Sequence, residues 1–161
     1  PASRTIFQLY AIERLCISQS DARPAVQEGW AANPTNDSQK DVWKEDWRSH
    51  RCIVPASWYF EWEHLPLANG KTKTGQKYMI QPKDSEMTWL AGLYRIEEFR
   101  DLKYPVFSVL TREPTAELSR IHDRMPLILP SNAIDDWIRP DTKAEEIAKM
   151  SVTDVFIEKA G

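Results

Sequence analysis

The stretch "SWYFEWEHLPLANGKTKTGQKYMIQP", residues 57–82, carries the strongest fold signal in the chain. It opens with an aromatic run, passes through Asn69-Gly70 and continues into the apolar residues 77–81. Asn-Gly between two such runs is the strongest short sequence signal for a β-hairpin. We therefore expect an antiparallel hairpin, with Glu61 placed unexpectedly inside its aromatic strand.

The sequence on either side of this hairpin continues the strand pattern. Upstream, "RCIVPASWYFEWEH" at 51–64 indicates a strand, a turn at Pro55 and a second strand. Downstream, "TWLAGLYRI" at 88–96 and "PVFSVLTR" at 105–112 are apolar runs of strand length. Consecutive strands of this kind favour an antiparallel sheet or barrel.

Short helices are expected around this sheet. The predicted helices lie in 38–50, in 114–122 with Thr115 as N-cap, in 131–138, and in 141–150, where Thr142 and Glu145 have capping-box spacing. Near the N-terminus, "TIFQLYAIERLCIS" fits either a strand pair or an amphipathic helix. The chain is interpreted as a single domain, 1–161, of the α+β class, β-rich with short peripheral helices.

Composition narrows the class of protein. The chain has 161 residues, of which 42% are hydrophobic and seven are tryptophans, enough for a core without disulfides. A net charge of −3 gives no overall attraction to nucleic acid, so such binding would need a local basic patch. Two cysteines, no signal peptide and no apolar run of about 20 residues predict a cytoplasmic protein without a membrane segment.

Glu61 is the first candidate functional residue. Ionised carboxylates are rarely buried without a partner, because loss of hydration costs several kcal/mol. Strand alternation places Tyr59, Glu61 and Glu63 on one face. Glu61 is then either a site residue, if that face lines a cleft, or an ordinary carboxylate on the polar side of a strand.

His122 is the second candidate, in "LSRIHDRMPLILP" at 118–130. A helix before it must end ahead of Pro126, which places His122 to Arg124 at an irregular helix end where functional side chains are common. His122 has the titration range suited to acid/base chemistry, whereas His50 and His64 lie in charged surroundings and are expected to be exposed. The alternative is a structural histidine beside a local Asp–Arg ion pair.

No metal or cofactor is indicated. The two cysteines and three histidines show no ligand spacing, and the five glycines form no phosphate-binding loop. No GxSxG nucleophile elbow occurs. Motifs alone therefore lead only to a possible Glu61–His122 acid/base pair.

Four segments nevertheless resemble the SRAP family (SOS response-associated peptidase). They occur in the family's order and with similar spacing: "RCIVPASWYFEW" (51–62), "MTWLAGLYR" (87–95), "FSVLTREP" (107–114) and "IHDRMPLILP" (121–130). The resemblance covers about residues 41–158 and implies a compact β-rich fold whose basic groove binds single-stranded DNA at abasic sites.

The resemblance also implies a chemistry. In the family, an N-terminal cysteine, exposed by removal of the initiator methionine or by autoproteolysis, forms a thiazolidine crosslink with the opened abasic sugar. Glu61 and His122 match the family's catalytic glutamate and histidine, Arg124 a DNA-contacting arginine, and Thr111 a residue near the bound strand. A carboxylate and an imidazole can supply the proton transfers, and Trp62 can stack on a base. The expected partner is single-stranded DNA with an abasic site, bound by a monomer without metal.

The N-terminal part, about 1–36, departs from the family and is divergent or incomplete. The chain opens "PASRTIF" instead of Met-Cys-Gly-Arg, Cys16 is internal, and Cys52 matches a structural position. Asn33 lies near the family's Asn-Ala-Arg segment, but its following residues do not match. We favour an N-terminal cysteine that is not visible in this chain. The alternatives are recruitment of Cys16, a non-catalytic or truncated nucleic-acid-binding remnant, and a small stress-associated domain with an acidic contact surface.

Overall fold

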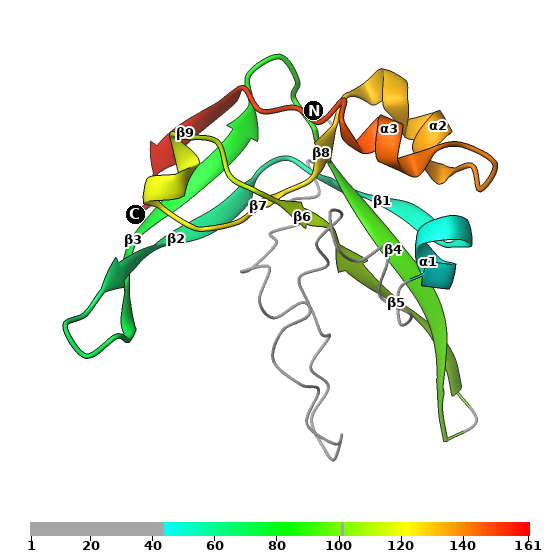
Figure 1. Cartoon of the computed structure of the whole chain (residues 1–161), viewed down its shortest axis with the longest axis horizontal. Coiled ribbons are helices and arrows are strands. Elements are labelled where there is room, and N and C mark those ends of the chain that lie inside the picture. The colour runs from blue at the N-terminus through cyan, green and yellow to red at the C-terminus, as the bar shows by residue number, and fades with distance from the viewer. Residues whose placement is uncertain (1–43, 101) are drawn as a thin grey trace, which may run out of the picture.

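The computed structural model describes residues 44–100 and 102–161, which form antiparallel sheets with short helices at the periphery (Figure 1). The expected α+β, β-rich class is confirmed, but the sheets are open, and those residues close no barrel. In chain order the elements are α1 (Lys44–Ser49), β1 (Arg51–Ala56), β2 (Tyr59–Pro66), β3 (Thr72–Pro82), β4 (Thr88–Phe99), β5 (Leu102–Val109), β6 (Thr111–Arg112), β7 (Met125–Pro126), β8 (Ile128–Leu129), α2 (Ile134–Ile138), α3 (Ala144–Ala148) and β9 (Val155–Lys159).

The expected hairpin is present as β2 and β3, which form a sheet in the order β2-β3-β9. Gly70 has the positive φ, 77°, that its turn requires. The pairing register places Glu61 opposite Tyr78 and Tyr59 opposite Ile80. Because β2 is at the edge of this sheet, its outer backbone groups are available to other segments.

β4 is the central strand of the second sheet. It pairs with β1 and β8 near its start and with β5 along its second half. Alternation sends Leu90 into one hydrophobic core and Ala91 and Leu93 into another. β4 therefore forms a wall between two cores, each of which gains about 1.5–3 kcal/mol for every large aliphatic side chain that it buries.

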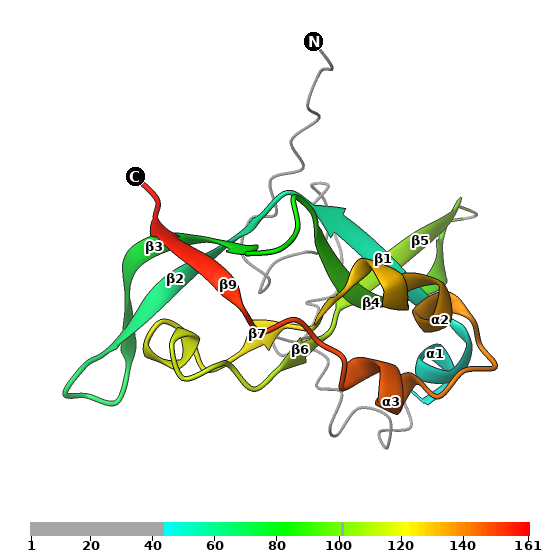
Figure 2. The same cartoon turned by 90° about the horizontal axis from the view of Figure 1, so that it is seen from above.

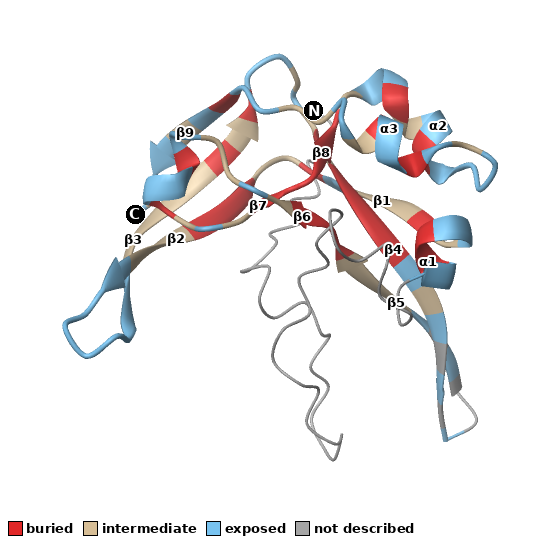
Figure 3. Cartoon of the chain, in the orientation of Figure 1, coloured by how far each residue is buried: buried red, intermediate tan, exposed pale blue. Residues whose placement is uncertain are grey.

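The two hydrophobic cores lie in different parts of the molecule and pack different elements. One packs the inner face of β2-β3-β9 against β8 and residues 118–121, and the other packs α1, α2 and α3 against β4. Viewed from above, the β2-β3-β9 sheet lies at one end and the helices at the other, with β6 and β7 between them (Figure 2). Burial is concentrated near the centre and fades toward the hairpin tips (Figure 3).

Two sequence expectations fail for identifiable reasons. Pro55 lies within β1 rather than at a turn, and the chain bends at 57–58 instead. β1 is at the edge of its sheet, so the missing N–H of proline costs no ladder hydrogen bond. The expected helix in 114–122 is only a 3₁₀ turn at Leu118–Arg120, where Thr115 Oγ1 accepts the Leu118 N–H at 3.3 Å.

The expected capping box before α3 is wrong. α3 begins at Ala144 without a side-chain cap, because Thr142 and Glu145 are used in tertiary contacts. Thr142 Oγ1 accepts a hydrogen bond from Arg51 at 3.0 Å, and Glu145 Oε1 accepts one from the Trp47 indole at 2.8 Å. The expected helix in 131–138 is present as a 3₁₀ turn continued by α2, and β9 was not anticipated.

In the part of the chain that the structure describes, every helix is too short or too polar to cross a bilayer.

Candidate active site and nucleic-acid interface

Glu61 belongs to the face of β2 that is turned toward the protein interior. It lies on the same face of the strand as Tyr59, which is 1% exposed and belongs to the core, and Glu61 itself is only 9% exposed. The alternative of a carboxylate on a solvent-facing side is therefore wrong. The carboxylate bends back to the backbone, where Oε1 accepts the Trp62 N–H at 3.3 Å.

The outer edge of β2 brings this carboxylate beside the loop that carries His122. The N–H groups of Trp62 and His64 point to the same side of the strand, because backbone groups alternate along it. Trp62 donates to Glu61, and two residues further on His64 donates to the Ile121 carbonyl at 3.0 Å. Glu61 and the loop 121–124 thus lie along one strand edge, although they are far apart in sequence.

His122 is held by its own loop. Its side chain is 13% exposed, and Nδ1 accepts the Arg124 N–H at 3.1 Å and lies 3.1 Å from Asp123 Oδ1. Nδ1 also lies 3.3 Å from the Arg124 carbonyl oxygen, so it faces one donor and two acceptors of its own loop. The loop therefore fixes the orientation of the His122 ring.

His64 is a member of this cluster that sequence reasoning missed. It was expected to be exposed, but it is half-buried, and its ring centre lies 4.2 Å from that of His122. The neighbouring Glu63 and Leu65 gave the impression of a solvent-facing strand end. The backbone hydrogen bond from His64 to the Ile121 carbonyl joins the two segments that carry the histidines, and no local pattern encodes it.

Arg124 and Thr111, the expected DNA contacts, are joined to each other. β6 pairs with β7, and the Arg124 guanidinium donates to the Thr111 carbonyl at 2.6 Å and to Thr111 Oγ1 at 3.2 Å. Arg124 Nη1 also donates to Glu113 Oε1 at 2.9 Å. Thr111 is 2% exposed, so it can orient the Arg124 guanidinium but is too buried to contact a ligand directly.

Trp62 points to the opposite face of β2 from Glu61. There it lies beside Phe60 and beneath Lys77, whose Nζ is 3.8 Å from the Phe60 ring centre and 5.4 Å from that of Trp62. A cation over aromatic rings is a favourable pairing. Trp62 therefore follows Glu61 directly in the sequence, but its ring lies on the opposite face of the sheet.

Cys52 occupies a structural position, as its sequence context indicated. It lies on β1 opposite Gly92, and its carbonyl accepts the Trp137 indole N–H at 2.9 Å. Burial raises the pKa of the Cys52 thiol from 9.0 to about 11. A thiol with such a pKa is almost entirely protonated at neutral pH and is a poor nucleophile. Cys16 and Asn33 lie outside the described residues.

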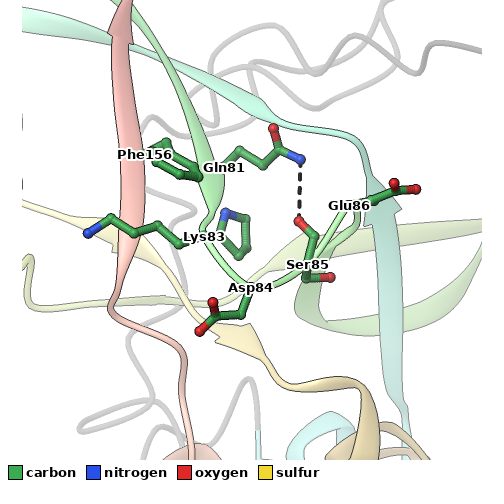
Figure 4. A pocket seen from close by; sticks show the side chains of 7 residues that line it. Gln81, Lys83, Asp84, Ser85, Glu86 and Phe156 are labelled. Atoms are coloured by element: carbon green, nitrogen blue, oxygen red, sulfur yellow. Dashed lines mark hydrogen bonds between the residues drawn. The ribbon is translucent and has the colours of Figure 1, made fainter.

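Within residues 44–100 and 102–161, no group of three or more His, Cys, Asp or Glu is placed to hold a metal ion. A shallow hollow lies between the β3–β4 turn and Phe156 of β9 (Figure 4). Two of its polar side chains already have partners, since Gln81 donates to the Ser85 carbonyl and Lys83 pairs with Asp154.

Comparison with known proteins defines the class. The family described as SOS response associated peptidase (SRAP) matches residues 28–158, and the chain belongs to this family. The protein is thus a member whose described part contains the family-like segments around Glu61 and His122.

Individual relatives agree with this assignment. The abasic site processing protein YoaM of Bacillus subtilis is 34% identical over 106 residues, which are 64% of this chain and 44% of YoaM. The abasic site processing protein YMR114C of Saccharomyces cerevisiae is 32% identical over 71% of this chain and 30% of its own length. The chain spans less than half of either relative. A crystal structure of a protein from Bacteroides thetaiotaomicron has the same fold, with a TM-score of 0.66 at 24% identity over 81% of this chain and 57% of its own.

Proposed function

We propose that this chain recognises abasic sites in single-stranded DNA and that the complete protein closes a covalent crosslink on the opened sugar. The observation that carries the proposal is the placement of the Glu61 carboxylate and the His122 loop along one edge of β2. The names of the relatives, which are abasic site processing proteins, support the same substrate.

The crosslink would form through an N-terminal cysteine that this chain does not show. The α-amine attacks the sugar aldehyde carbon, the carbinolamine loses water to give an imine, and the thiol adds to the imine carbon. The product is a thiazolidine, and the net change is the loss of one water molecule. Each step moves a proton to or from oxygen or nitrogen. Glu61 and His122 are the proposed acid/base residues for these transfers.

The described cysteine cannot form this ring. A thiazolidine needs a free α-amine, and the nitrogen of Cys52 is part of a peptide bond inside β1. Its raised pKa also keeps the thiol protonated. Cys16 would need cleavage of the preceding peptide bond to free its amine, which is the single autoproteolytic step proposed as the peptidase activity.

Arg124 is the proposed phosphate contact. Its guanidinium is oriented by Thr111, but Glu113 occupies one side of it. Because bidentate recognition of a phosphate uses two parallel N–H groups, a bound strand would have to displace the Glu113 carboxylate, which is 78% exposed and free to move into water. Trp62 is proposed to contact the strand on the other face of the sheet, by stacking on a base.

The first test is binding. A labelled single-stranded oligonucleotide with one abasic site, the same sequence undamaged, and the corresponding duplex are titrated with the protein, and affinity is read by fluorescence anisotropy. We expect tightest binding to the abasic single strand. Equal affinity for the damaged and undamaged strands would contradict abasic-site recognition.

The second test addresses the covalent step. Matched chains carrying an added N-terminal Cys or Ser are incubated with the abasic strand and separated on a denaturing gel. A shifted band with Cys and none with Ser supports the crosslink. Binding without a band in either chain favours the alternative, a nucleic-acid-binding remnant without the reaction.

A further inference from the structure

His64 has an unusual environment for a histidine next to a candidate active site. It lies on β2 three residues after Glu61, its ring centre is 4.2 Å from that of His122, and the ring planes are inclined by 57°. Its backbone N–H fixes the neighbouring loop through Ile121. The ring is half-buried, so it is not a mobile surface group.

The ring nitrogens of His64 are not used by the fold. Within residues 44–100 and 102–161, the His64 ring lies against the His122 ring, and no protein group hydrogen-bonds to either of its nitrogens. His50 differs, because its Nδ1 pairs with Asp46 Oδ1 at 3.0 Å. The His64 nitrogens are not among the buried polar atoms without a partner in this part of the chain, so solvent or a ligand can reach them.

We infer that His64 is a third substrate-contacting residue of the proposed site, with its ring nitrogens binding a sugar oxygen of the abasic nucleotide. The inference rests on the proposed function, since it takes the ligand of Glu61 and His122 to be that nucleotide. A neutral imidazole can both donate and accept a hydrogen bond, so it suits a hydroxyl or aldehyde oxygen.

The local charge favours a sugar oxygen over a phosphate. Glu61 and Glu63 precede His64 on β2, where alternation turns their side chains to the other face of the strand, and Asp123 follows His122 on the adjacent loop. Asp123, whose Oδ1 lies 3.1 Å from His122 Nδ1, repels a phosphodiester at the two rings, whereas the opened sugar is uncharged at the reacting carbon. Arg124, held by Thr111 and Glu113, is the cation of the same loop and is better placed for the phosphate.

A purely structural role for His64 predicts something different. If the ring only supports His122 by packing, a ring of similar shape will replace it. His64→Phe keeps the ring and removes both nitrogens, and His64→Gln loses the ring but keeps a donor and an acceptor. The two variants therefore separate packing from hydrogen bonding.

The direct measurement uses the three histidines of the chain, His50, His64 and His122, as reporters. Imidazole ¹⁵N signals of the labelled protein are followed during titration with the abasic oligonucleotide and with the undamaged strand. We expect the His64 and His122 signals to move with the abasic strand and those of His50 to stay in place. Shifts of His122 without any shift of His64 would overturn the inference.

Affinity for the abasic strand provides the second readout. We expect His64→Phe to weaken it about threefold to tenfold, as for one lost hydrogen bond, and His64→Gln to restore part of the loss. His50→Gln is the matched control and should bind like the wild type. Unchanged affinity in a folded His64→Phe overturns the role of His64 alone. Equal binding of both strands by the wild type overturns the proposed function and the inference together.

Discussion

A buried hydroxyl group without a hydrogen-bond partner within the described part of the chain lies two residues before Glu61, on Tyr59. Burial raises the pKa of this phenol far above its usual range, and the negative charge of Glu61 raises it further. The phenol therefore stays neutral, and its unpaired O–H costs about 1–3 kcal/mol. This residue shows that the interior beside Glu61 is not optimised for stability.

Tyr59→Phe should therefore stabilise the fold by about 1 kcal/mol, because it removes the unpaired hydroxyl and keeps the ring in the core. Urea denaturation followed by tryptophan fluorescence measures the change, and the slope of the transition should stay the same. Tyr78→Phe, at a half-buried position of the same core, is the control and should change little. A clear loss of stability in Tyr59→Phe would mean that the hydroxyl has a partner in solution, such as an ordered water.

Cys52 gives a prediction with a defined pH dependence. Its thiol has a pKa of about 11 in the fold instead of 9.0. A raised pKa means that the fold favours the neutral thiol, so this contribution to stability is complete below pH 9 and is lost as the pH rises toward 11.

At pH 8 the thiolate population of Cys52 should be about 100-fold below that of an ordinary thiol, because the shift is two pKa units. Alkylation by iodoacetamide, measured by mass spectrometry in a Cys16→Ser background, should be correspondingly slow in the native protein. Unfolding in urea should restore the ordinary rate. Rapid alkylation of the native protein would show that Cys52 is accessible and reactive.

At the scale of elements, Arg51 joins the first helix to the second. Its buried guanidinium donates to the Trp137 carbonyl at 2.5 Å and to the Trp47 carbonyl at 2.7 Å. It also donates to the carbonyls of Arg48 and Arg139 and to Thr142 Oγ1. Desolvation lowers the pKa of Arg51, but an arginine side chain remains charged. Carbonyl oxygens at the ends of α1 and α2 stabilise this positive charge by accepting its hydrogen bonds.

Arg51→Lys should destabilise the protein by about 2–4 kcal/mol. A lysine ammonium has three donors and lacks the planar fork, so several of these carbonyls would be left buried and unpaired. The midpoint of urea unfolding measures the loss, and the exposed Arg48→Lys is the control. Equal stability of the two variants would show that the carbonyls find other partners.

Some of these elements can be predicted from the sequence and others cannot. Asn69-Gly70 and the aromatic run predict the β2–β3 hairpin because these signals are local. The capping box at Thr142 and Glu145 fails because both side chains are drawn into contacts with Arg51 and Trp47, which are far away in sequence. β9 was missed because a five-residue strand becomes stable only through its pairing with β3.

For the molecule as a whole, the sequence predicts Glu61 and His122 as site residues but not the strand edge along which their segments meet. That edge depends on one long-range hydrogen bond, from His64 to Ile121, which no periodicity encodes. His64 was missed for the same reason. The interior position of Glu61 follows from the register of β2 on β3, which the alternation of the sequence leaves open.

The engagement of Arg124 by Glu113 leads to a prediction about DNA binding. In the proposed complex the carboxylate would compete with a phosphate for the same guanidinium, so Glu113→Gln should raise the affinity for the abasic single strand, up to about fivefold. Arg124→Ala should weaken binding and reduce the slope of log K against log salt by about 0.7. Anisotropy titrations at several salt concentrations measure both effects. An unchanged slope in Arg124→Ala would exclude this residue from phosphate contact.

Glu61→Gln tests whether the carboxylate serves the reaction or the fold. The amide keeps the shape of the side chain, and its Oε1 can still accept the Trp62 N–H, so the fold should persist. Removal of a general acid or base slows a reaction about 10²–10⁴-fold, or about 3 to 5 kcal/mol of barrier. In the chain with an added N-terminal Cys, the crosslink on the abasic strand should form slower by this factor, while affinity for the strand changes little. Quenched time points on a denaturing gel give the rate, and urea unfolding gives the stability. If Glu61→Gln unfolds the protein while the rate per folded molecule stays intact, the carboxylate is a structural group, and His122 would have to act without it.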